Sequence, residues 1–364
     1  MESTALTFGI EIEMIVPFLG IRSRTIDQDL LNPIPILRGD ENSGSEGIRA
    51  SIAQLLVDNG IDAISSNVKY DLGKPNIGPY GSKPWVVAFD NSLFSKDDRY
   101  HFAKIELQTP VMFYTEDYVA HLRRVCSVVA KNVRMEINKS CGLHIHIGDG
   151  NNGFTLGTLK KLVGFLWTFE KQLELIHPNH RLDNDFCVAP SKHSRLAKYG
   201  QLTSRKDGLA RIFEIRTINE VVRLMQWWPD GRTAYSITNL EDTNWEGRSN
   251  EEDTYHIYQD GDDQWDEENM GSEFTKRTIE FRQHEGVDLS EEGVERIVSW
   301  LRVCEAIVRY ARDQPRDVVE SYLMSVIDRD DVTLLELLTL LHLEGDAEFY
   351  EMRIRQHKVN PDRN

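Results

Sequence analysis

Four short stretches of the chain alternate between apolar and polar side chains at every second position. The polar positions are Glu11 and Glu13 in FGIEIEM, Glu106 and Gln108 in KIELQTP, His144 and His146 in GLHIHIG, and Glu280, Arg282 and His284 in TIEFRQH. Because successive side chains of a strand point to opposite faces, each stretch predicts a strand with one aliphatic face and one charged or imidazole-bearing face. A single face of this kind would be expected to meet water. Its recurrence, without lysine or threonine at the central polar positions, favours a shared site.

Elsewhere the apolar residues are spaced as in helices, at i, i+3 and i+4. GIRASIAQLLVDNG predicts a helix that ends at Gly60, and further helices are expected at about 115–132 and 156–176. The first strand is expected to run from Thr7 to Val16 and to be closed by Pro17, whereas WVVAFD and AKIELQT predict two more strands. The part from about 290 to 364 is helical in pattern, and LLELLTLLHL is its most apolar segment.

Composition narrows the classes of protein to which the chain can belong. The chain has 364 residues, long enough for one large domain or two modest ones, and a single domain over 1–364 is expected. Its formal net charge of −17 argues against non-specific binding to nucleic acid and against docking on anionic membranes. The longest apolar runs, such as MIVPFLGI, are too short to cross a membrane. The four cysteines lack metal-finger spacing and no basic, apolar leader precedes the first strand, so a cytoplasmic location is expected.

An acidic stretch lies at about 241–272. It is poor in aliphatic residues and interrupted by glycine, which predicts a solvated insertion. The alternative, a cation-binding loop, lacks the spacing and the closing glutamate of an EF-hand.

The charged strand faces predict a metal-dependent site. Neighbouring glutamates on one strand face repel each other, and burying them without partners would cost roughly several kcal/mol. If this face points inward, it therefore requires bound cations. Carboxylates with few imidazoles favour Mg²⁺ or Mn²⁺ over zinc. Arg282 is the type of residue that stabilises charge on a transferring phosphoryl group. Because neither a Walker A pattern nor Gly-X-Gly-X-X-Gly occurs, the phosphates of a nucleotide would be held by metals and side chains on an antiparallel sheet.

Six motifs in order then carry a resemblance to a known family. They are GIEIE, WVVAFDNSL, IELQTPV, GLHIHIG, RTAYSITNL and TIEFRQHEG, and they extend from residue 8 to about residue 286. In this order they resemble the amidoligase family, which is similar to glutamine synthetase and glutamate-cysteine ligase within the carboxylate-amine ligase superfamily. The resemblance implies an α+β fold with a curved, antiparallel, barrel-like sheet flanked by helices. It also implies ATP and two or three Mg²⁺ or Mn²⁺ ions.

The resemblance further implies roles for individual residues. The implied metal ligands are Glu11, Glu13, Glu106, His144 and Glu280. Among them, Glu106 would share the metal of Glu13, and His144 with Glu280 would share the metal of Glu11. The resemblance also implies a role for Glu13 in the nucleotide site and a role for Glu106 in catalysis.

Further positions match the family near the nucleotide. His146 would approach the nucleotide phosphates, and Arg282 would contact the transferring phosphoryl group. Asp90 and Ser92 match a D-X-S element of the nucleotide site, and Tyr235 with Asn239 match a Y-X-X-X-N element; Asp90 and Asn239 could equally be turn or cap residues.

The implied function is that of an ATP-dependent carboxylate-amine ligase. Such an enzyme forms an amide or peptide-like bond through an acyl phosphate, and its partners would be small-molecule or peptide acids and amines. Two alternatives stay open, a metal-dependent phosphotransferase or hydrolase on the same fold and a non-catalytic nucleotide- or metal-binding module. After EFRQHEG the chain has Val-Asp where relatives often have Thr-Leu, which leaves the substrate side of the last strand open. The sequence also leaves the oligomeric state open.

Overall fold

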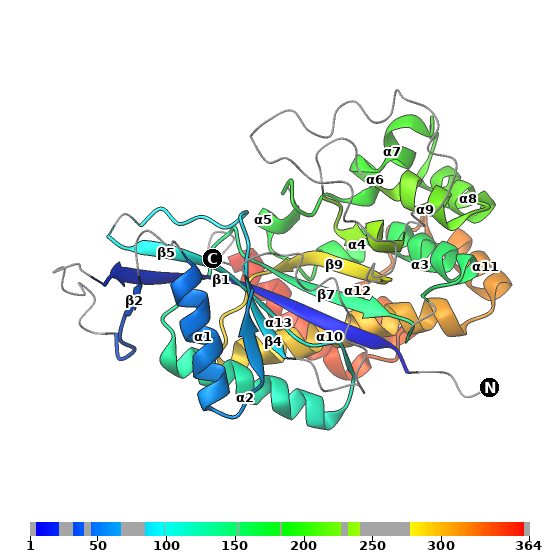
Figure 1. Cartoon of the computed structure of the whole chain (residues 1–364). Helices are drawn as coiled ribbons and strands as arrows, with labels where there is room; N and C mark the ends of the chain where they lie inside the picture. The colour runs from blue at the N-terminus through cyan, green and yellow to red at the C-terminus, as the bar shows by residue number, and fades with distance from the viewer. Residues whose placement is uncertain are drawn as a thin grey trace, which may run out of the picture. The chain divides into compact units, whose positions relative to one another are not determined.

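The computed structural model describes residues 5–21, 32–39, 45–66, 84–97, 99–150, 153–182, 184–226, 232–240 and 277–359. In these residues the chain forms a mixed α+β fold with one large, mostly antiparallel sheet flanked by helices (Figure 1). The predicted acidic insertion lies outside the described residues. The chain divides into two compact units, one spanning Met1–Ile147, Gln283–Glu305 and Gln356–Asn364 and the other Gly148–Arg282 and Ala306–Arg355.

The sheet contains nine strands in the described residues. They are β1 Thr7–Gly20, β2 Leu37–Gly39, β3 Ala63–Ser65, β4 Trp85–Phe89, β5 His101–Gln108, β6 Met112–Phe113, β7 Gly142–Gly148, β8 Tyr235–Ser236 and β9 Thr278–Glu285. Their order is β3-β4-β5-β1-β7-β9-β8, while β2 and β6 also pair with β1. The two ends of this order are different strands, so the described sheet is open. The barrel-like closure that the resemblance implied is therefore not formed by these strands.

Strand β1 continues beyond the predicted stop at Pro17. Pro17 lies opposite Phe102 of β5, and pairing with β5 extends one residue further, to Phe18. The amide of Ile15 donates to a carbonyl on the side of β1 away from β5, and amides two residues apart point to the same side. The missing N–H of Pro17 would point to that same side, away from β5. On that side, pairing of β1 with β2 begins only at Phe18, so the proline removes no hydrogen bond between paired strands.

In the first unit, helices cover the aliphatic face of the sheet. Helix α1 (Glu46–Asp58) packs on β3 and β4 and also contacts α2 (Glu116–Asn132) (Figure 1). The ring of Phe8 in β1 meets that of Tyr118 in α2 edge to face, with centroids 4.6 Å apart. Ile10 and Ile12 follow on the same face of β1 and are at most 1% exposed. Burying each such side chain contributes about 1.5–3 kcal/mol, and it fixes the opposite, polar face in place.

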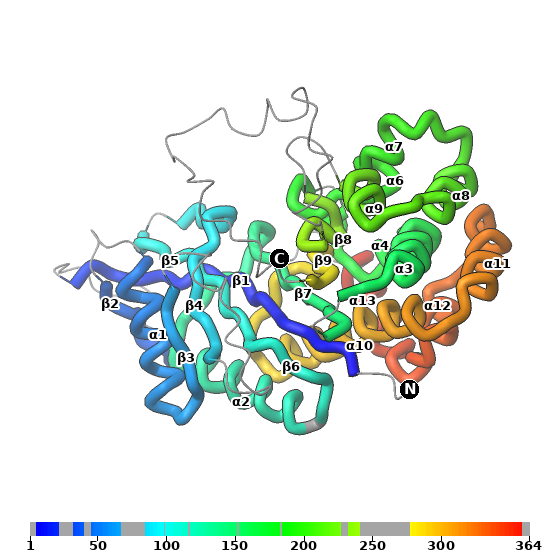
Figure 2. The backbone as a smooth tube through the Cα atoms, turned by 45° about the vertical axis from the view of Figure 1, so that its right-hand side comes forward, coloured from blue at the N-terminus to red at the C-terminus, as the bar shows by residue number. Residues whose placement is uncertain are grey.

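The second unit is mainly helical. Its elements are α3 Leu156–Thr168, α4 Glu170–Glu174, α5 Asn179–Leu182, α6 Pro190–His193, α7 Arg195–Tyr199, α8 Arg205–Glu214, α9 Ile218–Met225, α11 Arg316–Val326 and α12 Leu334–Leu340. Helix α3 packs against α8, α9 and α11 (Figure 2). Two further helices, α10 (Glu291–Asp313) and α13 (Ala347–Val359), contribute residues to both units.

The helix predicted at about 156–176 is interrupted at Phe169. Arg205 donates to the carbonyls of Trp167 and Thr168, at 2.5 and 3.2 Å. In a continuous helix these carbonyls would accept from amides four residues further on. The guanidinium takes their place as donor, so the chain forms two helices, α3 and α4, where one was expected.

Candidate metal centre

Strand register brings three of the predicted carboxylates together on one face of the first unit. Glu13 of β1 lies directly opposite Glu106 of β5, and Glu11 lies opposite Gln108. Directly opposed residues share a face of the sheet, with Cβ atoms about 4.5–5.5 Å apart. Glu11, Glu13 and Glu106 are 7%, 3% and 0% exposed, so this polar face is buried. Solvent exposure, the simpler account of a polar strand face, does not apply to these residues.

The two histidines of β7 face the carboxylates of β1. His144 Nδ1 lies 3.4 Å from Glu11 Oε2, and His144 Nε2 lies 3.5 Å from Glu13 Oε1. His146 Nε2 lies 3.2 Å from Glu11 Oε1. The second oxygen of Glu13 accepts from the Gly142 amide at 2.6 Å, so the backbone of β7 fixes the orientation of this carboxylate. Glu11 thus contacts both imidazoles, whereas Glu13 joins His144 to the start of the same strand.

The surroundings of His144 fit a bound cation. A neutral imidazole has one N–H donor and one lone pair, but both ring nitrogens of His144 face carboxylate oxygens, which only accept. A cation beside the ring nitrogen that carries the lone pair would supply the partner that a carboxylate oxygen cannot be. Ligands bound to one octahedral ion at about 2.1 Å, at right angles, lie about 3 Å apart. The 3.2 to 3.5 Å separations between these ring nitrogens and the carboxylate oxygens are close to that spacing.

Two groups within the first unit have ligand atoms close enough to hold an ion. Glu11, Glu106 and His144 form one group, and Glu13, Asp90 and Glu106 form the other; in each, the ligand atoms lie within 4.8 Å of one another. Glu106 belongs to both groups. A donor set dominated by carboxylate oxygens with one imidazole suits a hard divalent cation such as Mg²⁺ or Mn²⁺.

Asp90 forms a turn, one of the two roles that the sequence left open, and its expected role in the nucleotide site stays a prediction. Its Oδ1 accepts from the backbone amide of Ser92 at 2.7 Å and from the Ser92 hydroxyl at 2.5 Å, so it does stabilise a turn. It is also 4% exposed and has a carboxylate oxygen close to those of Glu13 and Glu106. The turn therefore holds the Asp90 carboxylate at the carboxylate cluster, with Ser92 as its partner.

Glu280 and Arg282 form a pair within the second unit. Arg282 Nη1 donates to Glu280 Oε1, and Arg282 Nε donates to the Phe186 carbonyl at 3.4 Å. Arg181 in turn donates to the backbone carbonyl of Arg282 at 2.7 Å. Both members of the pair are 7% exposed. The guanidinium is therefore oriented by a carboxylate and a carbonyl, and its predicted contact with a phosphoryl group stays a prediction.

The Y-X-X-X-N element has a mainly structural environment. Tyr235 is 4% exposed, lies opposite Phe281 in the β8–β9 pair and meets its ring edge to face at 5.7 Å. Asn239 is half-buried in a short 3-10 helix, Thr238–Leu240. The expected nucleotide-side roles of both residues stay predictions.

Sequence reasoning assigned no role to Gln108. In the structure it is 5% exposed, lies opposite Glu11 and donates through Nε2 to Glu106 Oε1. Its position two residues after Glu106 was the available indication, because that spacing places both side chains on one strand face.

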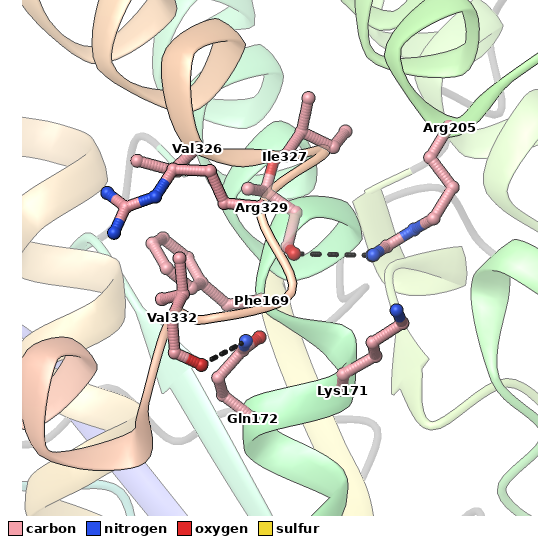
Figure 3. A pocket seen from close by; sticks show the side chains of 9 residues that line it. Phe169, Lys171, Gln172, Arg205, Val326, Ile327, Arg329 and Val332 are labelled. Carbon is pink, nitrogen blue, oxygen red and sulfur yellow. Dashed lines mark hydrogen bonds between the residues drawn. The ribbon is translucent and has the colours of Figure 1, made fainter.

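Two cavities of the second unit contain none of the predicted site residues. The first has a volume of about 10 Å³, room for about one water molecule. It is lined by Thr168, Phe169, Lys171, Gln172, Arg205, Val326, Ile327, Arg329 and Val332 (Figure 3). The second has a volume of about 450 Å³ and is lined by Arg195, Thr217, Asn219, Glu220, Arg223 and Leu224. The first cavity is too small for a nucleotide, and neither cavity contains a close group of buried acids such as the carboxylate cluster.

The cysteines do not add ligands to the candidate centre. All four are buried and none forms a disulfide. Cys141 precedes β7 directly, and burial raises the pKa of its thiol to about 12. The groups of candidate metal ligands found among the described residues contain no cysteine.

The fold and this cluster define the class of protein: a mixed α+β protein whose open sheet carries buried carboxylates and imidazoles able to hold divalent metal. The chain belongs to the family described as putative amidoligase enzyme, whose sequence profile matches residues 4–308. That description is of a ligase-type enzyme that forms amides. A comparison with curated proteins finds no match. None of the described helices is long and apolar enough to span a lipid bilayer.

Proposed function

We propose that the chain is an ATP-dependent carboxylate-amine ligase that forms an amide through an acyl phosphate and uses two or three Mg²⁺ or Mn²⁺ ions. The observation that carries the proposal is the buried cluster of Glu11, Glu13, Glu106 and His144 in a member of the amidoligase family. The two units are proposed to serve as one catalytic domain.

Electrostatics supports the requirement for cations. The three buried carboxylates Glu11, Glu13 and Glu106 outnumber the two imidazoles of β7, each of which contacts at least one of them. At about 5 Å and an effective dielectric constant of about 20, the charges of the directly opposed Glu13 and Glu106 would repel by about 3 kcal/mol. Bound divalent cations would remove this repulsion and, with ATP present, would neutralise charge on the phosphate oxygens.

The chain's own residues would then divide the work. Glu11 and Glu13 would hold different ions, Glu106 would share the ion of Glu13, and His144 with Glu280 would share the ion of Glu11. The 3.4 Å separation between His144 Nδ1 and Glu11 Oε2 and the position of Glu106 directly opposite Glu13 support this division within the first unit.

Three other groups would act at the nucleotide. His146 would orient the phosphates, Arg282 would stabilise the charge that builds on the transferring phosphoryl oxygens, and Asp90 with Ser92 would contribute to nucleotide binding. The planar guanidinium of Arg282 is already oriented by Glu280, which reduces the reorganisation required during phosphoryl transfer.

The proposed reaction joins an acid and an amine from small molecules or peptides. A carboxylate resists attack by an amine because oxide is a poor leaving group, and phosphorylation gives it a better one. The amine must lose a proton before it attacks, and a carboxylate of an acidic site could bind the ammonium group and accept that proton.

A metal-dependent screen tests the proposed reaction. ADP and phosphate release is measured over acids crossed with amines, and any conjugate is identified by mass spectrometry. A ligase releases ADP only when both acid and amine are present. Transfer of phosphate to a single substrate would indicate a phosphotransferase, and binding without ADP release would indicate a non-catalytic module; either result would contradict the proposal.

Variants test the assignment of the metal centre. We expect Glu11→Gln and Glu280→Gln to abolish activity with the fold intact, because an amide cannot replace a charged carboxylate at a divalent ion. Calorimetry with Mg²⁺ and a non-hydrolysable ATP analogue should show lost binding. Glu170→Gln is the matched control, since Glu170 is 3% exposed and bonded to Ser191 but is not a predicted ligand. Unchanged binding in both site variants would contradict the assignment.

A further inference from the structure

We propose that Gln108 is part of the metal centre: its side-chain carbonyl oxygen binds the cation held by Glu11 and His144, while its amide N–H group orients the neighbouring Glu106. This inference rests on the proposed function for the presence of the cation. It adds a neutral ligand that the sequence motifs did not assign.

The first support is the position of Gln108 in the sheet. It lies directly opposite Glu11 in the β1–β5 pair and two residues after Glu106, so its side chain lies on the face that bears both carboxylates. The next strand, β4, places Val86 opposite Gln108 on its other side. Gln108 is 5% exposed and Glu106 is 0% exposed, so their contact is shielded from solvent.

The second support is the orientation of the amide group. Gln108 Nε2 donates to Glu106 Oε1, and the reverse orientation would place the amide oxygen against a carboxylate oxygen. Because an ionised carboxylate only accepts hydrogen bonds, the nitrogen must face Glu106. The amide oxygen is attached to the same carbon as Nε2 and is therefore held beside the carboxylate cluster, at a fixed orientation.

The third support is that this oxygen lacks a hydrogen-bond partner among the described residues. Gln108 Oε1 is fully buried there and accepts from no donor. Leaving a buried polar atom without a partner costs about 1–3 kcal/mol, so such atoms in native proteins usually meet water or an ion. Amide carbonyls are ligands of hard cations, and a neutral oxygen adds no repulsion to three neighbouring carboxylates.

The chain offers a matched control in Gln172. This glutamine is 8% exposed, donates through Nε2 to the Val332 carbonyl at 3.0 Å, and also has an amide oxygen without a partner among the described residues. It lines the water-sized cavity of the second unit, where no group of candidate metal ligands is found among the described residues (Figure 3). Gln172→Leu therefore removes a comparable buried amide without touching the proposed centre.

The experiment measures binding of Mn²⁺ alone to the full chain, by calorimetry and by the electron paramagnetic resonance of free Mn²⁺. We expect Gln108→Leu to weaken Mn²⁺ binding about 10-fold or more, and Gln172→Leu to bind Mn²⁺ as the unmodified chain does. Melting curves identify the folded fraction of each variant. Wild-type affinity in folded Gln108→Leu would overturn the inference and leave the proposed function intact.

A second variant separates binding by the oxygen from orientation by the nitrogen. Gln108→Glu keeps an oxygen at the same place but loses the donor to Glu106, so a ligand role predicts Mn²⁺ affinity at least equal to that of the unmodified chain. A fall as large as that of Gln108→Leu would overturn the ligand role. If neither the unmodified chain nor Glu11→Gln binds Mn²⁺, both this inference and the proposed metal centre are overturned.

Discussion

Replacing Glu13 by glutamine should make the metal-free protein more stable. Glu13 lies directly opposite Glu106, and at a separation of about 5 Å the two charges repel by about 3 kcal/mol at an effective dielectric constant of about 20. Glutamine keeps an oxygen that accepts from the Gly142 amide, but a neutral acceptor weakens this hydrogen bond by about 1 kcal/mol. The net gain in the free energy of unfolding is about 1–2 kcal/mol. Each kcal/mol should raise the melting temperature by roughly 2–4 °C.

The same substitution should remove the stabilisation that metal gives. If Mn²⁺ binds only the folded chain, a concentration 100 times the dissociation constant stabilises it by about 2.7 kcal/mol. An amide lacks the charge that this site requires, so the rise in melting temperature on addition of Mn²⁺ should be small or absent in Glu13→Gln.

Calorimetric melting in EDTA and in excess Mn²⁺ measures both effects. Glu170→Gln serves as the control and should keep the full rise with Mn²⁺, because Glu170 is a buried carboxyl whose hydrogen-bond partner is Ser191. A lower melting temperature of Glu13→Gln in EDTA would mean that the carboxylate stabilises the fold through its contact with His144. A retained Mn²⁺ response would show that Glu13 is not a ligand, and the two results together would refute the reasoning.

Two further predictions concern other contacts. Arg282→Lys should bind ATP almost normally, but its turnover should fall about 100-fold or more, roughly 3 kcal/mol, because lysine lacks the planar fork. Single-turnover phosphoryl transfer, measured beside a melting curve, checks this, with Arg312→Lys as the control. A destabilised variant with normal turnover would contradict the prediction. Burial lowers the pKa of His121, whose Nε2 accepts from Trp85 Nε1 at 3.1 Å. Below about pH 6.5, the unfolded chain therefore binds more protons than the folded chain does. The free energy of unfolding should therefore fall from pH 7.5 to 5.5, and urea titrations of His121→Gln should show a smaller fall; an equal fall would contradict this origin.

Alternation of side chains predicted the main strands of the sheet, because a two-residue period follows directly from strand geometry. The strands bearing Glu11, Glu106 and His144 were found in this way, and so was the sharing of a face within each strand. The pairing of Glu13 with Glu106 was not predictable from spacing, since the residues are far apart in the chain and register depends on packing of the whole sheet.

Other differences arise from contacts that a local pattern does not contain. The passage of β1 through Pro17 depends on where neighbouring strands begin and end. The interruption at Phe169 depends on Arg205, a residue of another helix. The role proposed for Gln108 depends on its neighbour across the strand pair, because a glutamine in an alternating strand is otherwise typical of a solvated position.

The buried thiol of Cys141 has a practical consequence. With a pKa of about 12 and no measurable exposure, it should react with an alkylating reagent only when the chain around it opens. Cys141 lies at the start of the strand that carries His144, and its backbone carbonyl accepts from the Gly286 amide at 2.8 Å, just beyond the end of β9. The rate at which this cysteine is labelled would thus report local opening at the edge of the carboxylate cluster, without any engineered probe.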